Sequence, residues 1–264
     1  MRDPEKNSIL KDVNDLIDSE LGLMDIGETP HHKHKTSCDR LTKSPMTGIA
    51  LDLIAKIYDK VQENWRDSNC PKGSKKNWRF EKQPVISRKN RSPEVILEKA
   101  IVNISHEIWP DVTCWMNQVP VASGLTRRKE GRRAIDLVHR CGDGWYEFIE
   151  LKVNEGAGTP LFAAMEILQY GVLYMFSREN AKALGYEGTD KELLGATGIH
   201  LKVLAPATYY EGYDDLSQLE KSIRKGLAKF LAQRKFAFEL EMDFKFETLW
   251  LIPSRSPVTR KAPE

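Results

Sequence analysis

The chain lacks long hydrophobic runs and has only four cysteines. No window approaches the ~18 consecutive apolar residues of a membrane-spanning helix. The first six residues are polar and no apolar signal segment follows them, so we expect a soluble, cytoplasmic protein with no membrane partner. The cysteines are scattered and form no CxxC pair, which argues against a disulfide framework or a zinc cage; they are Cys38, Cys70, Cys114 and Cys141.

Three histidines lie close together, at His31, His32 and His34. A zinc site built from them and a cysteine is conceivable, but their spacing matches no closed tetrahedral pattern. We prefer the alternative, in which this stretch is a solvated loop.

The chain divides by pattern into two parts. Residues 1–91 form an N-terminal helical region with a basic linker, because residues 5–24 and 46–65 have helical periodicity. We expect residues 26–45, rich in Pro, His and Ser, to be a linker between these helices. The helices either dimerise the protein, dock a partner protein or fold back on the core, because an amphipathic helix covers an apolar surface.

Residues 92–264 carry the pattern of an α/β domain. Ser92-Pro93 and Thr159-Pro160 are good starts for helices, because Ser or Thr caps the first turn and proline fits the first helical position. The first helix has an apolar stripe of Leu97, Ile101, Ile104 and Ile108. We predict strands at 113–122, 133–140, 145–153, 199–204 and 236–246, and further helices at 159–176 and 214–233. This order predicts a mixed sheet with helices on both faces.

Basic side chains are concentrated in two segments, although the formal net charge is only +2. Residues 71–91 hold eight basic residues against one glutamate, and a second cluster follows at 127–133. Such segments suit a polyanion, and Trp78 and Phe80 could stack on bases; the alternative is a solvated, charged loop. The candidate nucleic-acid contacts are Lys75, Lys76, Arg79, Arg127, Arg128, Arg132 and Arg133.

A β-hairpin at residues 133–153 carries the candidate chemistry. Gly142-Asp143-Gly144 is a strong turn signal. A turn centred on Asp143 places Asp136 opposite Glu150, with Cβ atoms roughly 5 Å apart. Lys152 projects from the same face, two residues further on. The opposite face is apolar and predicts a core face that fixes this register; it holds Ile135, Leu137, Ile149, Leu151 and Val153. A bare two-residue turn would shift the register by one unless a bulge compensates.

Two facing carboxylates repel each other unless a cation lies between them. Mg²⁺ or Mn²⁺ prefers such oxygen ligands and makes a bound water easier to deprotonate. A lysine beside them can orient the attacking water or stabilise the transition state. Asp136, Glu150 and Lys152 thus make a minimal phosphodiesterase site.

Ile135-Asp136 followed by Glu150-Leu151-Lys152 resembles the PD-(D/E)xK nuclease superfamily. The resemblance covers residues 92–205 and implies a restriction-endonuclease-like α-β-β-β-α-β core, a metal held by Asp136 and Glu150, and Lys152 as the catalytic lysine. Ile135 replaces the proline of the family motif. The resemblance also implies an acidic residue from the preceding helix as a further metal ligand, for which Glu98 fits better than Glu94. It implies a glutamine on the following helix, Gln169, that holds the lysine, a water or a phosphate oxygen; Glu166 is a secondary candidate.

Three functions remain open. The first is a Mg²⁺- or Mn²⁺-dependent deoxyribonuclease, an endonuclease of a restriction, repair or phage-defence setting, with DNA as its partner and RNA not excluded. The second is a catalytically silent nuclease-fold module that binds nucleic acid or a partner protein. The third is an α/β protein whose hairpin charges are structural; substituting exposed charges then changes stability by less than ~1 kcal/mol.

Overall fold

The computed structural model describes residues 8–24, 30–43, 50–87, 92–108, 114–124, 133–154, 156, 158–187, 191–213 and 215–249. Its centre is a five-stranded mixed sheet in the order β1-β2-β3-β4-β5. The first three strands are antiparallel, and β3, β4 and β5 run parallel. The strands are β1 (Trp115–Pro120), β2 (Ala134–Gly142), β3 (Trp145–Leu151), β4 (Gly198–Ala205) and β5 (Glu241–Thr248). The expected mixed α/β architecture is confirmed at this level.

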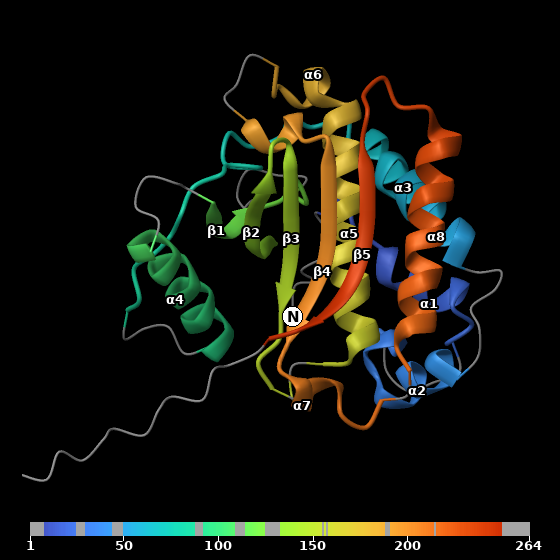
Figure 1. The fold of residues 1–264 in the computed structure, drawn as a ribbon. Coiled ribbons are helices and arrows are strands. Elements are labelled where there is room, and N and C mark those ends of the chain that lie inside the picture. Colours follow the sequence, from blue (N-terminus) through green and yellow to red (C-terminus); the bar gives the residue numbers. More distant parts are fainter. Residues whose placement is uncertain are drawn as a thin grey trace, which may run out of the picture.

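Helices flank the sheet (Figure 1). The helix α5 lies behind it in this view, α4 stands beside the β1 edge, and α8 and α3 lie on the side of β5. The α-helices are α1 (Val13–Glu20), α2 (Lys35–Lys43), α3 (Ala50–Asp67), α4 (Pro93–Ile108), α5 (Pro160–Glu179), α6 (Ala181–Leu184), α7 (Ala207–Tyr210) and α8 (Ser217–Arg234). Two 3₁₀ turns, η1 (His31–Lys33) and η3 (Glu192–Gly195), complete the described elements.

The helix α5 begins as its sequence predicts and packs closely on the sheet. The Thr159 side chain accepts a hydrogen bond from the Phe162 backbone N–H at 3.1 Å, which caps the first turn. At Gly171 a Cβ atom would stand 2.8 Å from Leu201 of β4, so a larger residue would push the helix off the strand. This close approach fixes how far the polar residues of α5 lie from β3.

The β2–β3 hairpin has the predicted register. Leu137 pairs with Ile149 and His139 with Glu147, which makes Asp136 and Glu150 neighbours across the two strands. The turn itself is the two-residue Asp143-Gly144, with Gly144 at φ +69°. A register shift between Arg140 and Gly142 compensates for the shorter turn. The β-bulge thus restores the pairing that a turn centred on Asp143 would have given.

Both faces of the sheet are covered, which differs from the single core face expected for the hairpin. Leu137, Ile149 and Leu151 do form a core, but a small one, with Val102 of α4. The large core lies on the other face, where Val138 and Phe148 pack under α5. Asp136, Glu150 and Lys152 project toward this second face, so they lie beside the main core and not on an open surface.

The predicted linker at 26–45 is wrong for the residues that the structure describes there. Residues 31–43 form η1 and α2, and His31 and His32 are buried. The cause is Asp18 of α1, whose carboxylate accepts the backbone N–H groups of both histidines and contacts His32 Nδ1 at 2.6 Å. One buried carboxylate therefore fastens this segment to α1.

The N-terminal helices fold back on the sheet domain. The first predicted helix begins at Val13, not at residue 5, and the second spans Ala50–Asp67. Ile17, Tyr58 and Val61 belong to the same buried cluster as Phe176 and Phe230 of α5 and α8. One continuous core thus joins the helical region to the sheet.

The apolar stripe predicted for α4 is only half buried. Leu97 and Ile101 pack against the small core, but Ile104 and Ile108 are exposed. Val102, Glu98 and Ser105 form the buried face instead. The helix is rotated relative to the prediction, and a polar residue, Glu98, occupies part of its buried face.

The basic segment has no regular secondary structure over residues 70–87, as expected. Trp78 nevertheless is fully buried and packs on Phe148 and Tyr174, so it is not available for base stacking. Phe80 is partly buried against Tyr146. Among the described residues, no helix is both long and apolar enough to cross a membrane.

Candidate functional site

The two carboxylates and the lysine of the hairpin do come together. Lys152 Nζ lies 2.7 Å from Glu150 Oε1. Asp136, one strand away, accepts the Leu151 backbone N–H through Oδ2 at 2.9 Å. The side chains of Glu150 and Lys152 are only 7% and 9% exposed, whereas Asp136 is partly exposed. The cluster is thus a mostly buried site that opens through Asp136.

A third carboxylate completes the cluster. Glu166 of α5 places Oε2 3.1 Å from Lys152 Nζ, and its side chain is 26% exposed. Three acidic side chains therefore surround one ammonium group: Asp136, Glu150 and Glu166 against Lys152. When all are ionised the cluster carries two uncompensated negative charges, which is costly at this depth.

The pKa values of the carboxyl groups reflect this excess. Burial raises the pKa of Glu150 well above its ordinary value, and the negative charges of Asp136 and Glu166 add to the rise. Burial also raises the pKa of Asp136 to about 6, although the Leu151 N–H and the Lys152 charge oppose the change. Burial alone would lower the pKa of Lys152, but Glu150 and Glu166 outweigh it and raise that pKa. The lysine stays protonated while its carboxylates compete for protons.

Glu98 of α4 lies next to the cluster. It is 1% exposed, and its pKa is raised to about 8 by burial and by the nearby Asp136 charge. Its Oε2 accepts a hydrogen bond from Gln118 Nε2 at 2.7 Å. Gln118 has a left-handed backbone (φ +51°) in the middle of β1, between Asn117 and Val119, whose pairing partners flank Asp136. Such strain in a non-glycine residue is concentrated at functional sites.

Gln169 contacts a different partner from the one expected. Its Nε2 lies 3.3 Å from Asn14 Oδ1 of α1, and its buried Oε1 has no hydrogen-bond partner among the described residues. Tyr170, next to it, is buried, and the pKa of its hydroxyl is raised by burial and by the charges of Glu150 and Glu166. The N-terminal helix α1 thus reaches the α5 wall of the site.

The first basic segment lies at the other end of the sheet. Lys191 Nζ donates to the backbone oxygens of Lys75 and Asn77, and Lys191 leads through η3 to the start of β4. This places Lys75 near the beginning of β3, whereas Glu150 stands about 17 Å further along the strand. Lys75, Lys76 and Arg79 are exposed there, and Arg79 pairs with Glu81. The structure does not bring them together with the carboxylates.

The second basic cluster is described only at Arg133. Its positive charge acts on the Tyr170 hydroxyl, so Arg133 lies close to the carboxylates. The other predicted contacts of this cluster, Arg127, Arg128 and Arg132, lie outside the described residues.

Carboxylate oxygens are the ligands that a hard divalent cation prefers. No group of three or more His, Cys, Asp or Glu side chains converges as a metal site within the described ranges. Asp136 and Glu150 nevertheless present carboxylate oxygens beside each other, with an excess of negative charge that a divalent cation would neutralise. These two residues would hold the ion, with Glu166 at the open side.

Comparison with known proteins found no matching family model, no matching curated protein and no matching solved structure. The assignment of a function therefore depends on the residues themselves.

The sequence indicates Glu166 as a member of the site more readily than it indicates Gln118. Glu166 lies on the helix that begins at Thr159, after the strand that holds Glu150 and Lys152, and the sequence offers it as a secondary candidate. Gln118 gives no such signal, because nothing in the sequence predicts its positive φ.

Proposed function

We propose that the protein is a metal-dependent nuclease that hydrolyses DNA phosphodiester bonds at Asp136, Glu150 and Lys152. The observation that carries the proposal is the charge imbalance: three carboxylates, from β2, β3 and α5, surround one lysine. A purely structural cluster gains nothing from this repulsion, whereas a site for a divalent cation and a phosphate requires it. The element order α4-β1-β2-β3-α5-β4 supports a restriction-endonuclease-like core.

Each residue has a role that follows from its position. Asp136 and Glu150 would hold Mg²⁺ or Mn²⁺, which supplies a more acidic water and neutralises phosphate charge when bound. Lys152 keeps its proton, so its ammonium group orients the attacking water and stabilises the negative charge that develops on the phosphate. Glu166 holds the lysine in place from α5 and accepts a proton at the open side of the site. Glu98 lies near Asp136 and holds Gln118 through a hydrogen bond.

The test is cleavage of linear, supercoiled and single-stranded DNA by the purified protein with Mg²⁺ or Mn²⁺. Asp136→Asn, Glu150→Gln and Lys152→Ala are each expected to reduce the rate by at least about 10²-fold, and a chelator should abolish cleavage. Glu147→Gln is the matched control, because Glu147 is an ion-paired glutamate of the same strand on the opposite face. Circular dichroism verifies that each variant is folded. A metal-loaded wild-type protein that leaves all three substrates intact contradicts the proposal.

One observation favours a second candidate, the silent nuclease-fold module. The Lys152 ammonium already contacts both Glu150 and Glu166 and is 9% exposed, as in a closed ion-pair network. This alternative expects DNA binding that Lys152→Ala leaves unchanged and no calorimetric signal with Mg²⁺ or Mn²⁺. A metal signal that Glu150→Gln abolishes rejects it.

A further inference from the structure

A second polar cavity lies beside the candidate site, beyond the ends of β3 and β4. It has a volume of about 350 Å³ and is lined from three parts of the chain. Lys33 and Lys35 come from η1 and α2, Thr159 from the start of α5, and Tyr209 from α7. A water molecule takes up ~30 Å³ of liquid, so the cavity accommodates a five-atom phosphate group with water around it.

The lining has an excess of positive charge. Lys33 and Lys35 contribute two ammonium groups, and Glu211 is the one carboxylate among the described residues that line the cavity. Neither lysine forms an ion pair with a carboxylate of the described residues. Their ammonium groups instead lie over aromatic rings, Lys33 over Phe162 at 5.3 Å and Lys35 over Tyr213 at 5.5 Å. The two cations are thus held at the cavity without being neutralised.

The Tyr209 hydroxyl is an independent sign of a ligand. Tyr209 is 1% exposed, and its buried hydroxyl has no hydrogen-bond partner among the described residues. A buried hydroxyl without a partner costs about 1–3 kcal/mol, so a side chain of this kind is normally paired. Because Tyr209 lines the cavity, an oxygen-rich ligand there would supply the missing acceptor.

The cavity adjoins the catalytic lysine. The Lys152 backbone N–H donates to Leu204 O at the end of β4, and α7 with Tyr209 follows that strand directly. The Lys152 charge acts on the Tyr209 hydroxyl, whose pKa burial raises. Gly156 and Gly158, in the loop after Lys152, also line the cavity. Ligands of α/β proteins commonly bind at this place, outside the carboxyl ends of parallel strands.

We propose that this cavity binds a phosphate group through Lys33, Lys35 and the Tyr209 hydroxyl. The N-terminus of α5, whose N-cap is Thr159, adds a partial positive charge. The inference rests on the proposed function for the source of the phosphate, which is the strand held at Asp136 and Glu150. That phosphate is either the terminal group of a strand or an internal one, and both present negatively charged oxygen acceptors.

The first experiment measures the binding of inorganic phosphate by the shift that it causes in the melting temperature, with chelator present. Phosphate is expected to raise the melting temperature of the wild-type protein, and Tyr209→Phe should lose at least half of that rise. The unliganded Tyr209→Phe protein should melt no lower than wild type, because the removed hydroxyl had no partner. A Tyr209→Phe protein with an unchanged response to phosphate, together with an unchanged Lys33→Met/Lys35→Met protein, overturns the proposal.

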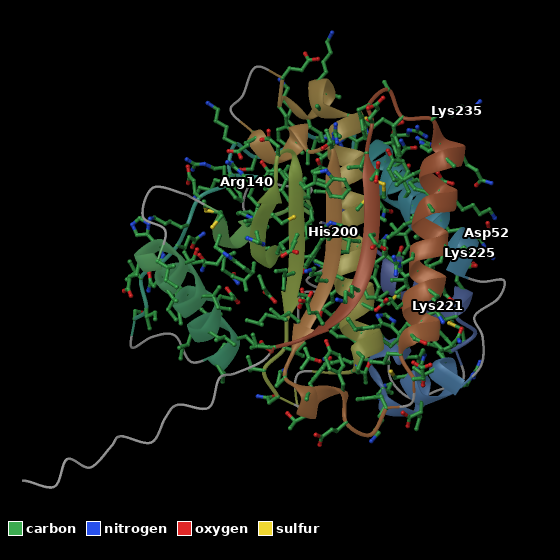
Figure 2. All side chains as sticks on the ribbon, viewed as in Figure 1. Asp52, Arg140, His200, Lys221, Lys225 and Lys235 are labelled. Atoms are coloured by element: carbon green, nitrogen blue, oxygen red, sulfur yellow. The ribbon has the colours of Figure 1, made fainter. Side chains whose placement is uncertain are left out.

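The second experiment uses 3′-labelled single-stranded oligodeoxynucleotides with a 5′-phosphate or a 5′-hydroxyl. Fluorescence anisotropy measures how tightly the protein binds each of them. Lys33→Met/Lys35→Met is expected to weaken binding at least tenfold and to reduce the salt slope by roughly 0.7, for one lost phosphate contact. The control is Lys221→Met/Lys225→Met, because Figure 2 shows these lysines on the outer side of α8; its binding should change less than twofold.

The comparison of the two oligonucleotides identifies which phosphate the cavity binds. Tighter binding of the 5′-phosphorylated strand, lost in the double variant, assigns the cavity to a terminal phosphate. Equal binding of both strands, weakened equally by the double variant, assigns it to an internal phosphate. Binding as tight as in wild type overturns the inference.

These experiments distinguish a failure of the phosphate site from a failure of the nuclease proposal. If wild type cuts no DNA but Lys33→Met/Lys35→Met loses phosphate binding, the nuclease proposal fails and the phosphate site stands. If wild type cuts DNA and both cavity variants bind phosphate normally, only the phosphate site fails.

Discussion

Two clusters of carboxylates and lysine lie on opposite faces of the same sheet. On one face, Glu147 contacts His139 at 2.9 Å and Lys202 at 2.6 Å, and Glu247 contacts the same lysine at 2.7 Å. Figure 2 shows this face at His200, on the side away from α5. On the other face, Lys152 lies among Glu150, Glu166 and Asp136.

The two clusters differ in how their charges balance. Burial alone would raise the pKa of Glu147, but hydrogen bonds from His139 and Lys202 lower it to about 2. Burial raises the pKa of Glu150, and its two negative neighbours add to the rise, which its one cationic partner does not offset. A stabilising ion-pair network lowers the pKa of its acids, whereas raised pKa values in a cluster of acids are typical of a functional site. The contrast within one sheet is therefore the main argument for the assignment.

The largest expected effect comes from removing the lysine of each cluster. Without metal at pH 8, Lys152→Met should lower the free energy of unfolding by about 3–5 kcal/mol, because buried carboxylates lose their one cation. Lys202→Met should cost less, about 1–2 kcal/mol, because hydrogen bonds from His139 remain on Glu147. Urea denaturation measures both. Equal losses would remove the distinction between the clusters.

The pH dependence should have opposite signs in the two clusters. Glu98, beside the Glu150 cluster, has a pKa of about 8 against an ordinary 4.5. The native state then binds its proton more tightly, so stability falls as pH rises from 4.5 to 8, by on the order of 5 kcal/mol. Glu147, with a pKa of about 2, contributes stability above pH 4.5 that is lost as pH falls toward 2.

Urea denaturation from pH 3 to pH 8 in chelator separates these contributions. Glu98→Gln should flatten the curve above pH 4.5, and Glu147→Gln should flatten it below that pH. A Glu98→Gln protein with the wild-type slope between pH 4.5 and 8 would contradict the raised pKa.

Divalent cations should stabilise one cluster only. A ligand at 100 times its dissociation constant adds ≈ 2.7 kcal/mol of stability, so Mg²⁺ or Mn²⁺ should raise the melting temperature at pH 8. Glu150→Gln and Asp136→Asn should lose this rise, and Glu147→Gln should keep it. A rise that persists in Glu150→Gln would place the ion elsewhere.

The sequence predicts the hairpin well because its constraints are local. Alternating apolar residues and the Asp143-Gly144 turn determine which residues share a face, and the register follows from them. What the alternation leaves open is which face is covered by more of the chain. That depends on α5, whose close packing at Gly171 puts the main core on the side of Glu150.

The remaining features depend on long-range contacts. Asp18 holds η1 through three hydrogen bonds, and no pattern in residues 26–45 indicates that partner. Trp78 lies in a basic segment yet fills the core between Phe148 and Tyr174. Tyr209 follows β4, and its place beside Lys152 becomes evident only when the parallel strands are aligned.

The smallest expected effect tests whether charge imbalance, and not burial alone, raises the pKa values. Glu166→Gln removes one negative charge but keeps the shape of the α5 wall, and Glu166 is 26% exposed. We expect the metal-free protein at pH 8 to become more stable by about 1 kcal/mol, because the remaining carboxylates repel each other less. The pKa of Asp136 should also fall from about 6 toward its ordinary value, which carboxyl ¹³C NMR titration measures.

Glu247→Gln is the matched control: it removes a carboxylate from the balanced cluster and should destabilise the protein by a similar small amount. If both substitutions change stability in the same direction, the two clusters do not differ in charge balance.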